Sequence, residues 1–216
     1  MTAPPTRTVV HLLRHGEVHN PDGVLYGRLD GYHLSELGRE MAELAARHLA
    51  DHDVTHVVAS SLTRAQETAQ PIAQSHGVAI TTDDRVIEAS NSFEGARVGD
   101  MRPTAFLHPR YWGRLTNPLR PSWGEPYAEI AVRMSAAIED TRAAARGHEA
   151  VIVSHQLPIW TARNKVMGRR LWHDPRKREC RLASLTTLTY EGEELESVTY
   201  SEPAASLLVR SHGGTG

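Results

Sequence analysis

The chain has 216 residues, with 24 lysines and arginines against 26 aspartates and glutamates, which is a formal net charge of −2. This length can bury a substantial core, and the near-balanced charge argues against binding to nucleic acid or to an anionic membrane. The single cysteine, Cys180, excludes an internal disulfide and any zinc site made of several cysteines.

No segment of the sequence resembles a membrane anchor or an export signal. Residues 1–8 hold prolines and one arginine but no apolar centre, and no apolar run approaches about 18 residues. We therefore expect a cytoplasmic protein without a membrane partner.

The N-terminal part predicts a strand followed by a helix. Residues 8–13 are apolar and β-branched, as in a short buried strand. Ser35 is expected to cap a helix whose apolar positions recur at helical spacing as far as Leu49, with Gly38 tolerated in its first turns.

The alternation of strand and helix then continues. Residues 55–59 predict a second buried strand, and Ser60 or Ser61 is expected to cap a helix that Gly77 stops. Residues 78–81 predict a short third strand.

Residues 97–126 interrupt this alternation. Because a loop of this length in a compact domain is usually a lid or a binding element, we expect a lid or substrate segment inserted into a single domain that spans 1–216. Its arginines stand among Tyr111, Trp112 and Trp123 and suit an anionic or ring-bearing part of a substrate. Tryptophans that simply pack on the sheet are an equal alternative. The arginines of residues 99–126 are Arg102, Arg110, Arg114 and Arg120.

The C-terminal part predicts two helices and three strands. Helices are expected over 127–145 and 157–167, on either side of a strongly apolar strand at 150–154. Residues 182–190 and 194–200 flank a Glu-Gly-Glu turn and predict a hairpin. The whole order favours a three-layer α/β/α sandwich around a mostly parallel sheet, to which the hairpin adds an antiparallel strand.

Polar side chains follow three of the predicted strands. Arg14 and His15 follow the first, Arg64 lies in the first helical turn after the second, and His155 follows the strand at 150–154. Because ligands bind beyond the carboxyl ends of strands in open α/β sheets, we expect these side chains to share a pocket. Two arginines, two histidines and helix N-terminal amides suit a tetrahedral phosphate dianion.

The pair Arg14-His15 also suits nucleophilic attack on phosphorus. An imidazole attacks only when neutral, and its unperturbed pKa of about 6.5 leaves it largely neutral at pH 7. Arg14 would bind phosphoryl oxygens and lower the histidine pKa further, and Gly16 would let the backbone approach a ligand.

Four motifs extend this pattern over about residues 8–160. They are Arg14-His15-Gly16-Glu17, Leu34-Ser35-Glu36-Leu37-Gly38, residues 60–69 (SSLTRAQETA) and Val153-Ser154-His155. In their order and spacing the chain resembles the histidine phosphatase superfamily, in its phosphoglycerate-mutase-like branch. The C-terminal hairpin also fits the fold of that family.

The resemblance implies a covalent mechanism that needs no cofactor and no metal. His15 would be the nucleophile, forming a phosphohistidine that water later hydrolyses. Arg14, Arg64 and His155 would hold the phosphoryl oxygens and neutralise charge in the transition state.

The proton donor of that family is an acidic residue after the third strand. Glu88 stands there, ahead of an aromatic-Glu-Gly element at 93–95, and would protonate the leaving oxygen and then activate water. Glu94 is the alternative acid, and a solvated surface carboxylate is the alternative role for Glu88.

Two positions depart from the family pattern. The asparagine that usually lies seven residues beyond the arginine stands six beyond Arg14, as Asn20, and Gln156 replaces the glycine that commonly follows the second histidine. We retain Asn20 and Gln156 as candidate phosphate-binding residues.

Other features of the sequence favour structural roles. His11, His15 and His19 recur every four residues, as metal ligands on one helical face would, but the run before them predicts a strand, so we expect no metal site there. The basic residues at 169–170 and 176–178 indicate a solvated face, with a nucleic-acid contact as the alternative. Cys180 has no base visible in the sequence, which favours a buried or inert thiol over a nucleophile.

We therefore expect a metal-independent phosphomonoesterase that acts on a small phosphorylated metabolite, with no nucleic-acid partner and with a homodimer left open. A cofactor-dependent phosphoglycerate mutase is the alternative on the same fold, although this chain is short for one. A catalytically silent protein that binds a phosphorylated ligand is the alternative from another class. The intact acid argues against it, because binding alone needs no proton donor.

Overall fold

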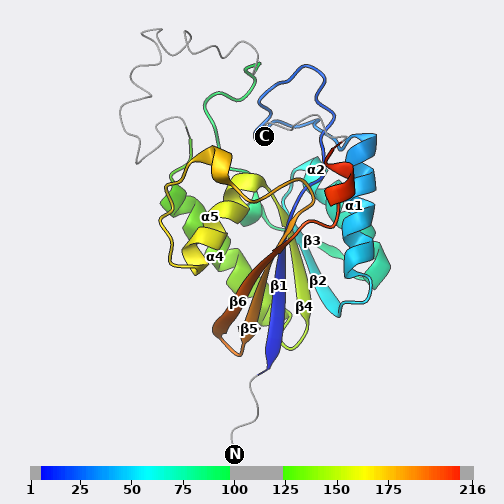
Figure 1. Cartoon of the computed structure of the whole chain (residues 1–216), viewed down its shortest axis with the longest axis vertical. Helices are drawn as coiled ribbons and strands as arrows, with labels where there is room; N and C mark the ends of the chain where they lie inside the picture. Colours follow the sequence, from blue (N-terminus) through cyan, green and yellow to red (C-terminus); the bar gives the residue numbers. More distant parts are fainter. Residues whose placement is uncertain (1–5, 98–123, 210–216) are drawn as a thin grey trace, which may run out of the picture.

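The computed structural model describes residues 6–97 and 124–209, and a six-stranded β-sheet forms its centre (Figure 1). The strands lie in the order β3-β2-β4-β1-β5-β6. Strands β1 to β4 pair in parallel, whereas β5 is antiparallel to both β1 and β6. The predicted mostly parallel sheet with an antiparallel strand is confirmed. The strands are β1 (Arg7–Arg14), β2 (Val54–Ala59), β3 (Ile80–Thr82), β4 (Glu149–Ser154), β5 (Leu185–Glu191) and β6 (Glu194–Ser201).

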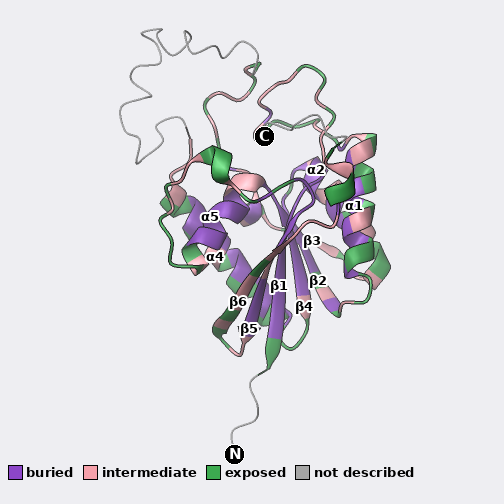
Figure 2. Cartoon of the chain, viewed as in Figure 1, coloured by how far each residue is buried: buried purple, intermediate pink, exposed green. Residues whose placement is uncertain are grey.

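Helices cover both faces of the sheet (Figure 1). Helices α1 (Glu36–Leu49) and α2 (Thr63–His76) pack on one face, and α4 (Tyr127–Ala144) and α5 (Gln156–Val166) pack on the other. Successive strand residues point to opposite faces, so Leu12 joins the core under α4 and α5, and Leu13 joins the core under α1 and α2. Strands β1, β2, β4 and β5 are therefore buried along most of their length, whereas the edge strands β3 and β6 are more exposed (Figure 2).

The start of α1 is as the sequence predicts. The Ser35 hydroxyl accepts a hydrogen bond from the backbone N–H of Gly38 at 2.9 Å and caps the helix. A Cβ on Gly16 would lie 2.5 Å from the carbonyl oxygen of Gly38, and one on Gly38 would overlap the carbonyl oxygen of Glu17. These two glycines thus let the loop after β1 pack against the helix, a role that the sequence did not reveal.

The prediction that Ser60 or Ser61 caps α2 is wrong. The helix begins after Leu62, which makes no side-chain cap. The Ser60 hydroxyl lies 3.3 Å from the Leu62 N–H and 2.9 Å from Nε2 of His155. The Ser60 side chain therefore contacts His155, which follows the neighbouring strand β4, and does not cap the helix.

Two strands begin later than predicted. After Gly77, in the left-handed conformation with φ 67°, the Val78 N–H still bonds back to Ala73, so β3 begins only at Ile80. Near the C-terminus Ala183 has φ 51°, which interrupts the extended run and delays β5 to Leu185.

Most of the predicted lid segment at 97–126 lies outside the described residues. That range includes the arginines Arg102, Arg110, Arg114 and Arg120, so their role in substrate binding stays a prediction. In the two described ranges, no helix combines the length and apolarity needed to cross a membrane.

Candidate active site

Four of the predicted site residues meet at the carboxyl ends of β1, β2 and β4. Arg14 ends β1, and the parallel register pairs it with Ser154 of β4, so that His15 and His155 follow on adjacent strands. Their ring centroids lie 5.1 Å apart. Arg64 enters from the first turn of α2. All four side chains are buried, so two guanidinium groups and two imidazole rings are gathered together out of contact with water.

The hydrogen bond of His15 determines which of its nitrogens can react. Nδ1 lies 2.7 Å from the carbonyl oxygen of Gly16, and a carbonyl oxygen only accepts, so Nδ1 carries the proton. Nε2 then keeps its lone pair. Burial, followed by the charges of Arg64 and Arg14, lowers the pKa of His15 well below 6.5. The ring is therefore neutral at pH 7 and can act as a nucleophile through Nε2.

The two arginines are held in place by backbone carbonyls. Arg14 donates from Nη1 to the carbonyl oxygen of Cys180 at 2.8 Å, and Arg64 donates from Nη2 to that of Gly27 at 2.6 Å. The Arg64 guanidinium also lies over the Tyr26 ring, 4.8 Å from its centroid. Each arginine keeps further N–H groups for a ligand.

His155 completes the positive side of the site. Its Nε2 lies 2.9 Å from the Ser60 hydroxyl, and burial, then His15 and the nearby arginines, lower its pKa well below 6.5. Among the unpartnered buried nitrogens of the described residues, three belong to this group: Nδ1 of His155 and the Nε atoms of Arg14 and Arg64. Buried polar atoms are normally satisfied, so their arrangement fits an anionic ligand that supplies oxygen acceptors.

Glu88 is an acid whose charge interacts with both arginines of this group. It follows the short helix η1 (Asp84–Val86), and its Oε1 accepts a hydrogen bond from the Ala89 N–H at 2.8 Å. Burial raises the pKa of Glu88, although that bond, Arg64 and Arg14 oppose the rise. A carboxyl group with a raised pKa holds a proton to higher pH, which is what a general acid requires.

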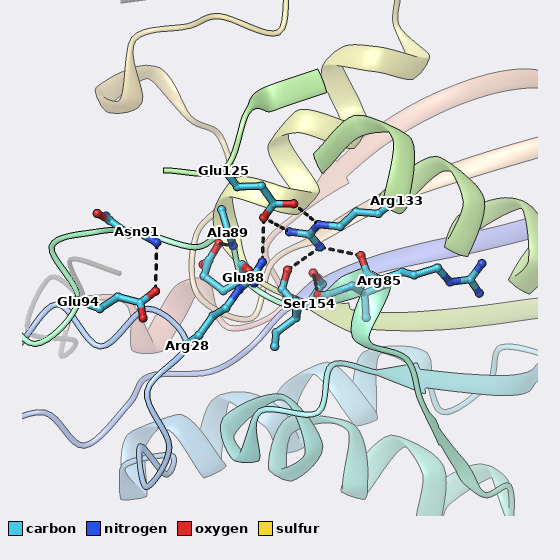
Figure 3. A network of polar contacts seen from close by, with 11 residues as sticks. Arg28, Arg85, Glu88, Ala89, Asn91, Glu94, Glu125, Arg133 and Ser154 are labelled. Atoms are coloured by element: carbon cyan, nitrogen blue, oxygen red, sulfur yellow. Dashed lines mark hydrogen bonds and ion pairs between the residues drawn. The ribbon is translucent and has the colours of Figure 1, made fainter. Parts of the chain in front are cut away.

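Two arginines hold the backbone on either side of the Glu88 side chain (Figure 3). Arg28 donates from Nε to the carbonyl oxygen of Glu88 at 2.6 Å, and Arg133 donates from Nη1 to that of Ile87 at 2.7 Å. Both arginines also bind the carboxylate of Glu125, which lies between them. We call Arg28, Glu125 and Arg133 the backbone clamp.

The side chains of Glu94 and Asn20 form hydrogen bonds with the backbone of their own loops. The Glu94 Oε1 accepts from the Asn91 N–H at 3.1 Å, and its side chain fills the space beside Gly27. The Asn20 side chain donates to the Val24 carbonyl and accepts from the Val24 N–H, which closes the loop between them. A role for Asn20 in phosphate binding stays a prediction.

Gln156 lines a cavity beside Glu88 together with residues that the sequence did not indicate. The cavity walls include Tyr127, Glu125 and Arg178. Arg178 donates to Oε1 of Gln156 at 3.3 Å, and burial lowers the pKa of its guanidinium. The prediction of a solvated basic face therefore fits the exposed Arg176 and Lys177, but not Arg178.

Tyr26, Arg178 and the backbone clamp are the residues that sequence reasoning missed. No motif or spacing identified them as site residues: all lie in irregular segments except Arg133, which reaches the site from α4. Cys180, by contrast, is buried as expected, and burial raises its thiol pKa to about 11. Among the described residues a possible metal-binding group is present only at His11, His52 and Glu149, away from the carboxyl ends of the strands.

Comparison with known proteins identifies relatives across almost the whole chain. The family model for the histidine phosphatase superfamily (branch 1) matches residues 10–203. The uncharacterized protein Rv0525 of Mycobacterium tuberculosis is 56% identical over 201 residues, which cover 93% of this chain and 99% of that protein. A Yersinia pestis protein named "Probable phosphoglycerate mutase GpmB" is 28% identical over 184 residues, which cover 84% of this chain and 85% of that one.

Solved structures show the same fold. YhfR of Bacillus stearothermophilus is 25% identical with a TM-score of 0.75, covering 90% of this chain and 96% of that chain. The mycobacterial glucosyl-3-phosphoglycerate phosphatase Rv2419c is 24% identical with a TM-score of 0.71 and the same coverage. At 24% identity, the likeness to Rv2419c is a likeness of fold alone.

Proposed function

The chain belongs to the histidine phosphatase superfamily (branch 1), and we propose that it is a phosphatase that hydrolyses a phosphate monoester of a small metabolite. The observation that carries the proposal is the state of His15: buried, with its Nδ1 bonded to the Gly16 carbonyl and its pKa lowered by burial and by two arginines. This is the state required of a nucleophilic imidazole.

In the first step Nε2 of His15 attacks phosphorus, and the bond between phosphorus and the leaving oxygen breaks. Glu88 gives its proton to that oxygen, so the alcohol leaves neutral. Arg14, Arg64 and His155 donate hydrogen bonds to the phosphoryl oxygens, which carry the charge of the transition state. The products are the alcohol, a phosphohistidine at His15 and a Glu88 carboxylate.

In the second step water hydrolyses the phosphohistidine. The Glu88 carboxylate takes a proton from the water as its oxygen bonds to phosphorus, and the bond between phosphorus and Nε2 breaks. Inorganic phosphate leaves, His15 is neutral again and Glu88 is protonated. The two steps return every catalytic group to its starting state and use no metal.

The proposal is tested by trapping the intermediate. The full chain is mixed with a phosphate-labelled substrate, denatured within one turnover, and the label is followed at low and at high pH, with and without a chelator. We expect a label that is labile to acid and stable to alkali, and turnover that the chelator leaves unchanged. A label with the stability of an acyl phosphate or phosphoserine would overturn the proposal.

A panel of substrates separates phosphatase from mutase. The panel contains p-nitrophenyl phosphate, phosphorylated metabolites, and 3-phosphoglycerate with and without 2,3-bisphosphoglycerate. A phosphatase releases inorganic phosphate from at least one of them. Interconversion of phosphoglycerates without phosphate release would make the chain a mutase, and phosphate binding without turnover would make it a silent binding protein.

A further inference from the structure

A second pair of histidines lies around one carboxylate, that of Glu149 at the start of β4. Nε2 of His11 and Nδ1 of His52 are each 2.7 Å from Oε2 of Glu149. All three atoms lie within 4.8 Å of one another. His11 belongs to β1, Glu149 begins β4, and His52 follows the end of α1. Three segments distant in sequence thus bring three metal-binding atoms to one point.

The donor set and its spacing suit a transition-metal ion. Two imidazole nitrogens with one carboxylate oxygen favour Zn²⁺ and its neighbours over Mg²⁺ or Ca²⁺, which prefer oxygen ligands. With bonds of about 2.0–2.2 Å in a tetrahedron, zinc ligands lie about 3.4 Å apart. The two nitrogen-to-oxygen separations of 2.7 Å are shorter than that value, and the ligand atoms of the three residues all lie within 4.8 Å of one another. A small movement of the side chains admits the ion.

The neighbours of His11 already orient its ring as in a metal site. Its Nδ1 lies 2.9 Å from the Thr187 hydroxyl, and Thr187 is directly opposite His11 in the pairing of β1 with β5. A metal-binding histidine usually bonds its second nitrogen in this way. In this structure Nε2 donates to the carboxylate of Glu149, so Nε2 must lose its proton when an ion binds, and the Thr187 hydroxyl can then accept a hydrogen bond from Nδ1.

The three ligands also differ in exposure in a way that permits entry. The side chain of His11 is 5% exposed and that of Glu149 17%, whereas that of His52 is 35% exposed. The first two are held by sheet strands, and the third faces solvent on the turn after α1. An ion could reach the group from the side of His52.

We propose that His11, His52 and Glu149 bind one Zn²⁺-class ion, with water as a fourth ligand. The ion joins the end of α1 to β1 and β4, and its role is structural. His11 lies four residues before His15, about 13 Å along a strand, so the ion takes no part in phosphoryl transfer. Without the ion, the two histidines share hydrogen bonds to Glu149, as they do in this structure.

The test is a metal titration of the full chain without a histidine tag. Chelator-treated protein is titrated with Zn²⁺ by calorimetry at pH 7.5, and its Tm is measured across Zn²⁺ concentrations. We expect one ion per chain, proton release on binding, and a Tm that rises with Zn²⁺ because the ion binds only the folded state. Absence of saturable binding would overturn the proposal.

Variants locate the ion. His52→Ala and Glu149→Gln should abolish the site, and circular dichroism checks that each is folded. His148→Ala is the matched control, because it removes an exposed histidine paired with Asp53 at 2.6 Å and should bind Zn²⁺ normally. His15→Ala should also bind normally, which excludes the candidate active site. Normal binding by folded His52→Ala, or its loss in His15→Ala, would contradict the assignment.

Cobalt gives a second measurement that does not depend on stability. Co²⁺ bound by nitrogen and oxygen in a tetrahedral site absorbs visible light more strongly than hydrated Co²⁺. The absorption should saturate at one ion per chain, persist in His148→Ala and disappear in His52→Ala. Because His52 is outside the catalytic group, its variant should turn over p-nitrophenyl phosphate within about twofold of the wild type, so the fates of this proposal and of the proposed function are separable.

Discussion

Strand β1 contains His11 and is followed directly by His15, and these two histidines belong to pairs with opposite surroundings. His15 and His155 lie beside Arg14 and Arg64, and they bond to a backbone carbonyl and to a serine hydroxyl. His11 and its partner His52 both contact the carboxylate of Glu149. The same side chain thus faces cations at the end of the strand and an anion nearer its start.

The difference shows how neighbours assign a role to a histidine. Beside arginines and out of water, the cationic form is disfavoured, so the ring of His15 stays neutral and nucleophilic. In the other pair it is the carboxylate whose pKa changes, since the hydrogen bonds from His11 and His52 lower the pKa of Glu149 to about 2. The first arrangement suits attack on phosphorus, and the second suits a fixed ion pair or a metal ligand set.

The largest expected effect is the loss of turnover when His15 is removed, compared with removal of a histidine of the other pair. His15→Ala should lower turnover of p-nitrophenyl phosphate by a factor on the order of 10⁴ or more, because no nucleophile remains. His52→Ala removes a histidine of the other pair and should leave turnover within about twofold. Steady-state phosphate release measures both. Substantial turnover by His15→Ala, or an equal loss in His52→Ala, would show that the two pairs do not divide the work in this way.

The second largest effect concerns Glu88, the acid that interacts with Arg14 and Arg64 in the candidate active site. Glu88→Gln should lower turnover about 10²- to 10⁴-fold on alkyl phosphates, whose leaving group needs a proton, and far less on p-nitrophenyl phosphate. Glu94→Gln is the matched control and should not show this selectivity. If Glu94→Gln shows it instead, the acid is Glu94, and equal losses on both substrates would make Glu88 structural.

The pH profile of kcat on alkyl phosphates sharpens the same assignment. His15 must be neutral, and its pKa lies well below 6.5, so its requirement is met from mildly acidic pH upward. Glu88 must be protonated, and its pKa is raised by burial, so kcat should fall as the pH rises through that pKa. In Glu88→Gln this fall should disappear, and its persistence would assign the limb to another group.

The arginine–histidine group could be predicted from sequence because it depends on local pattern and chain direction. Apolar runs located β1, β2 and β4, and the carboxyl ends of parallel strands must share an edge of the sheet. His15 and Arg64 therefore had to approach each other once their strands were identified. The family resemblance added the order of the motifs.

The rest depended on contacts that no local pattern records. Tyr26 and Arg178 reach the site from irregular loops, and the polar role of Ser60 was hidden by its plausibility as a helix cap. The group at His11 was missed for a related reason. The sequence spacing paired His11 with His15 and His19, whereas the fold pairs it with His52 and Glu149, distant in sequence.

A smaller effect is expected at Glu125, whose contacts differ from those of the carboxylate at the other histidine pair. Glu149 touches histidines directly, whereas Glu125 binds Arg28 and Arg133, which hold the backbone around Glu88. Glu125→Gln should loosen this clamp and lower kcat on alkyl phosphates by about tenfold, with little change on p-nitrophenyl phosphate, because only the proton donor loses its position.

The control for that substitution is Glu139→Gln, which removes another arginine-paired carboxylate, on α4. It should leave both substrates unaffected. The substrate selectivity of Glu125→Gln separates positioning from general damage, since unfolding would lower turnover on both substrates alike. A parallel loss on both would mean that the clamp supports the fold and not the acid.

The smallest expected effect is on the acid stability of the metal-free protein. The pKa of Glu149 falls from 4.5 in the unfolded chain to about 2 in the folded one, chiefly through its bond to His11. Its contribution to stability is therefore complete above pH 4.5 and is lost as the pH falls toward 2, at no more than about 1.4 kcal/mol per pH unit. Glu149→Gln should make the free energy of unfolding, measured by urea titration with chelator present, less dependent on pH between 4.5 and 2. Glu43→Gln, at an exposed position on α1, should keep the wild-type dependence. An unchanged slope in Glu149→Gln would mean that the carboxylate is not held by the histidines in solution, and the contrast between the two histidine pairs would fail.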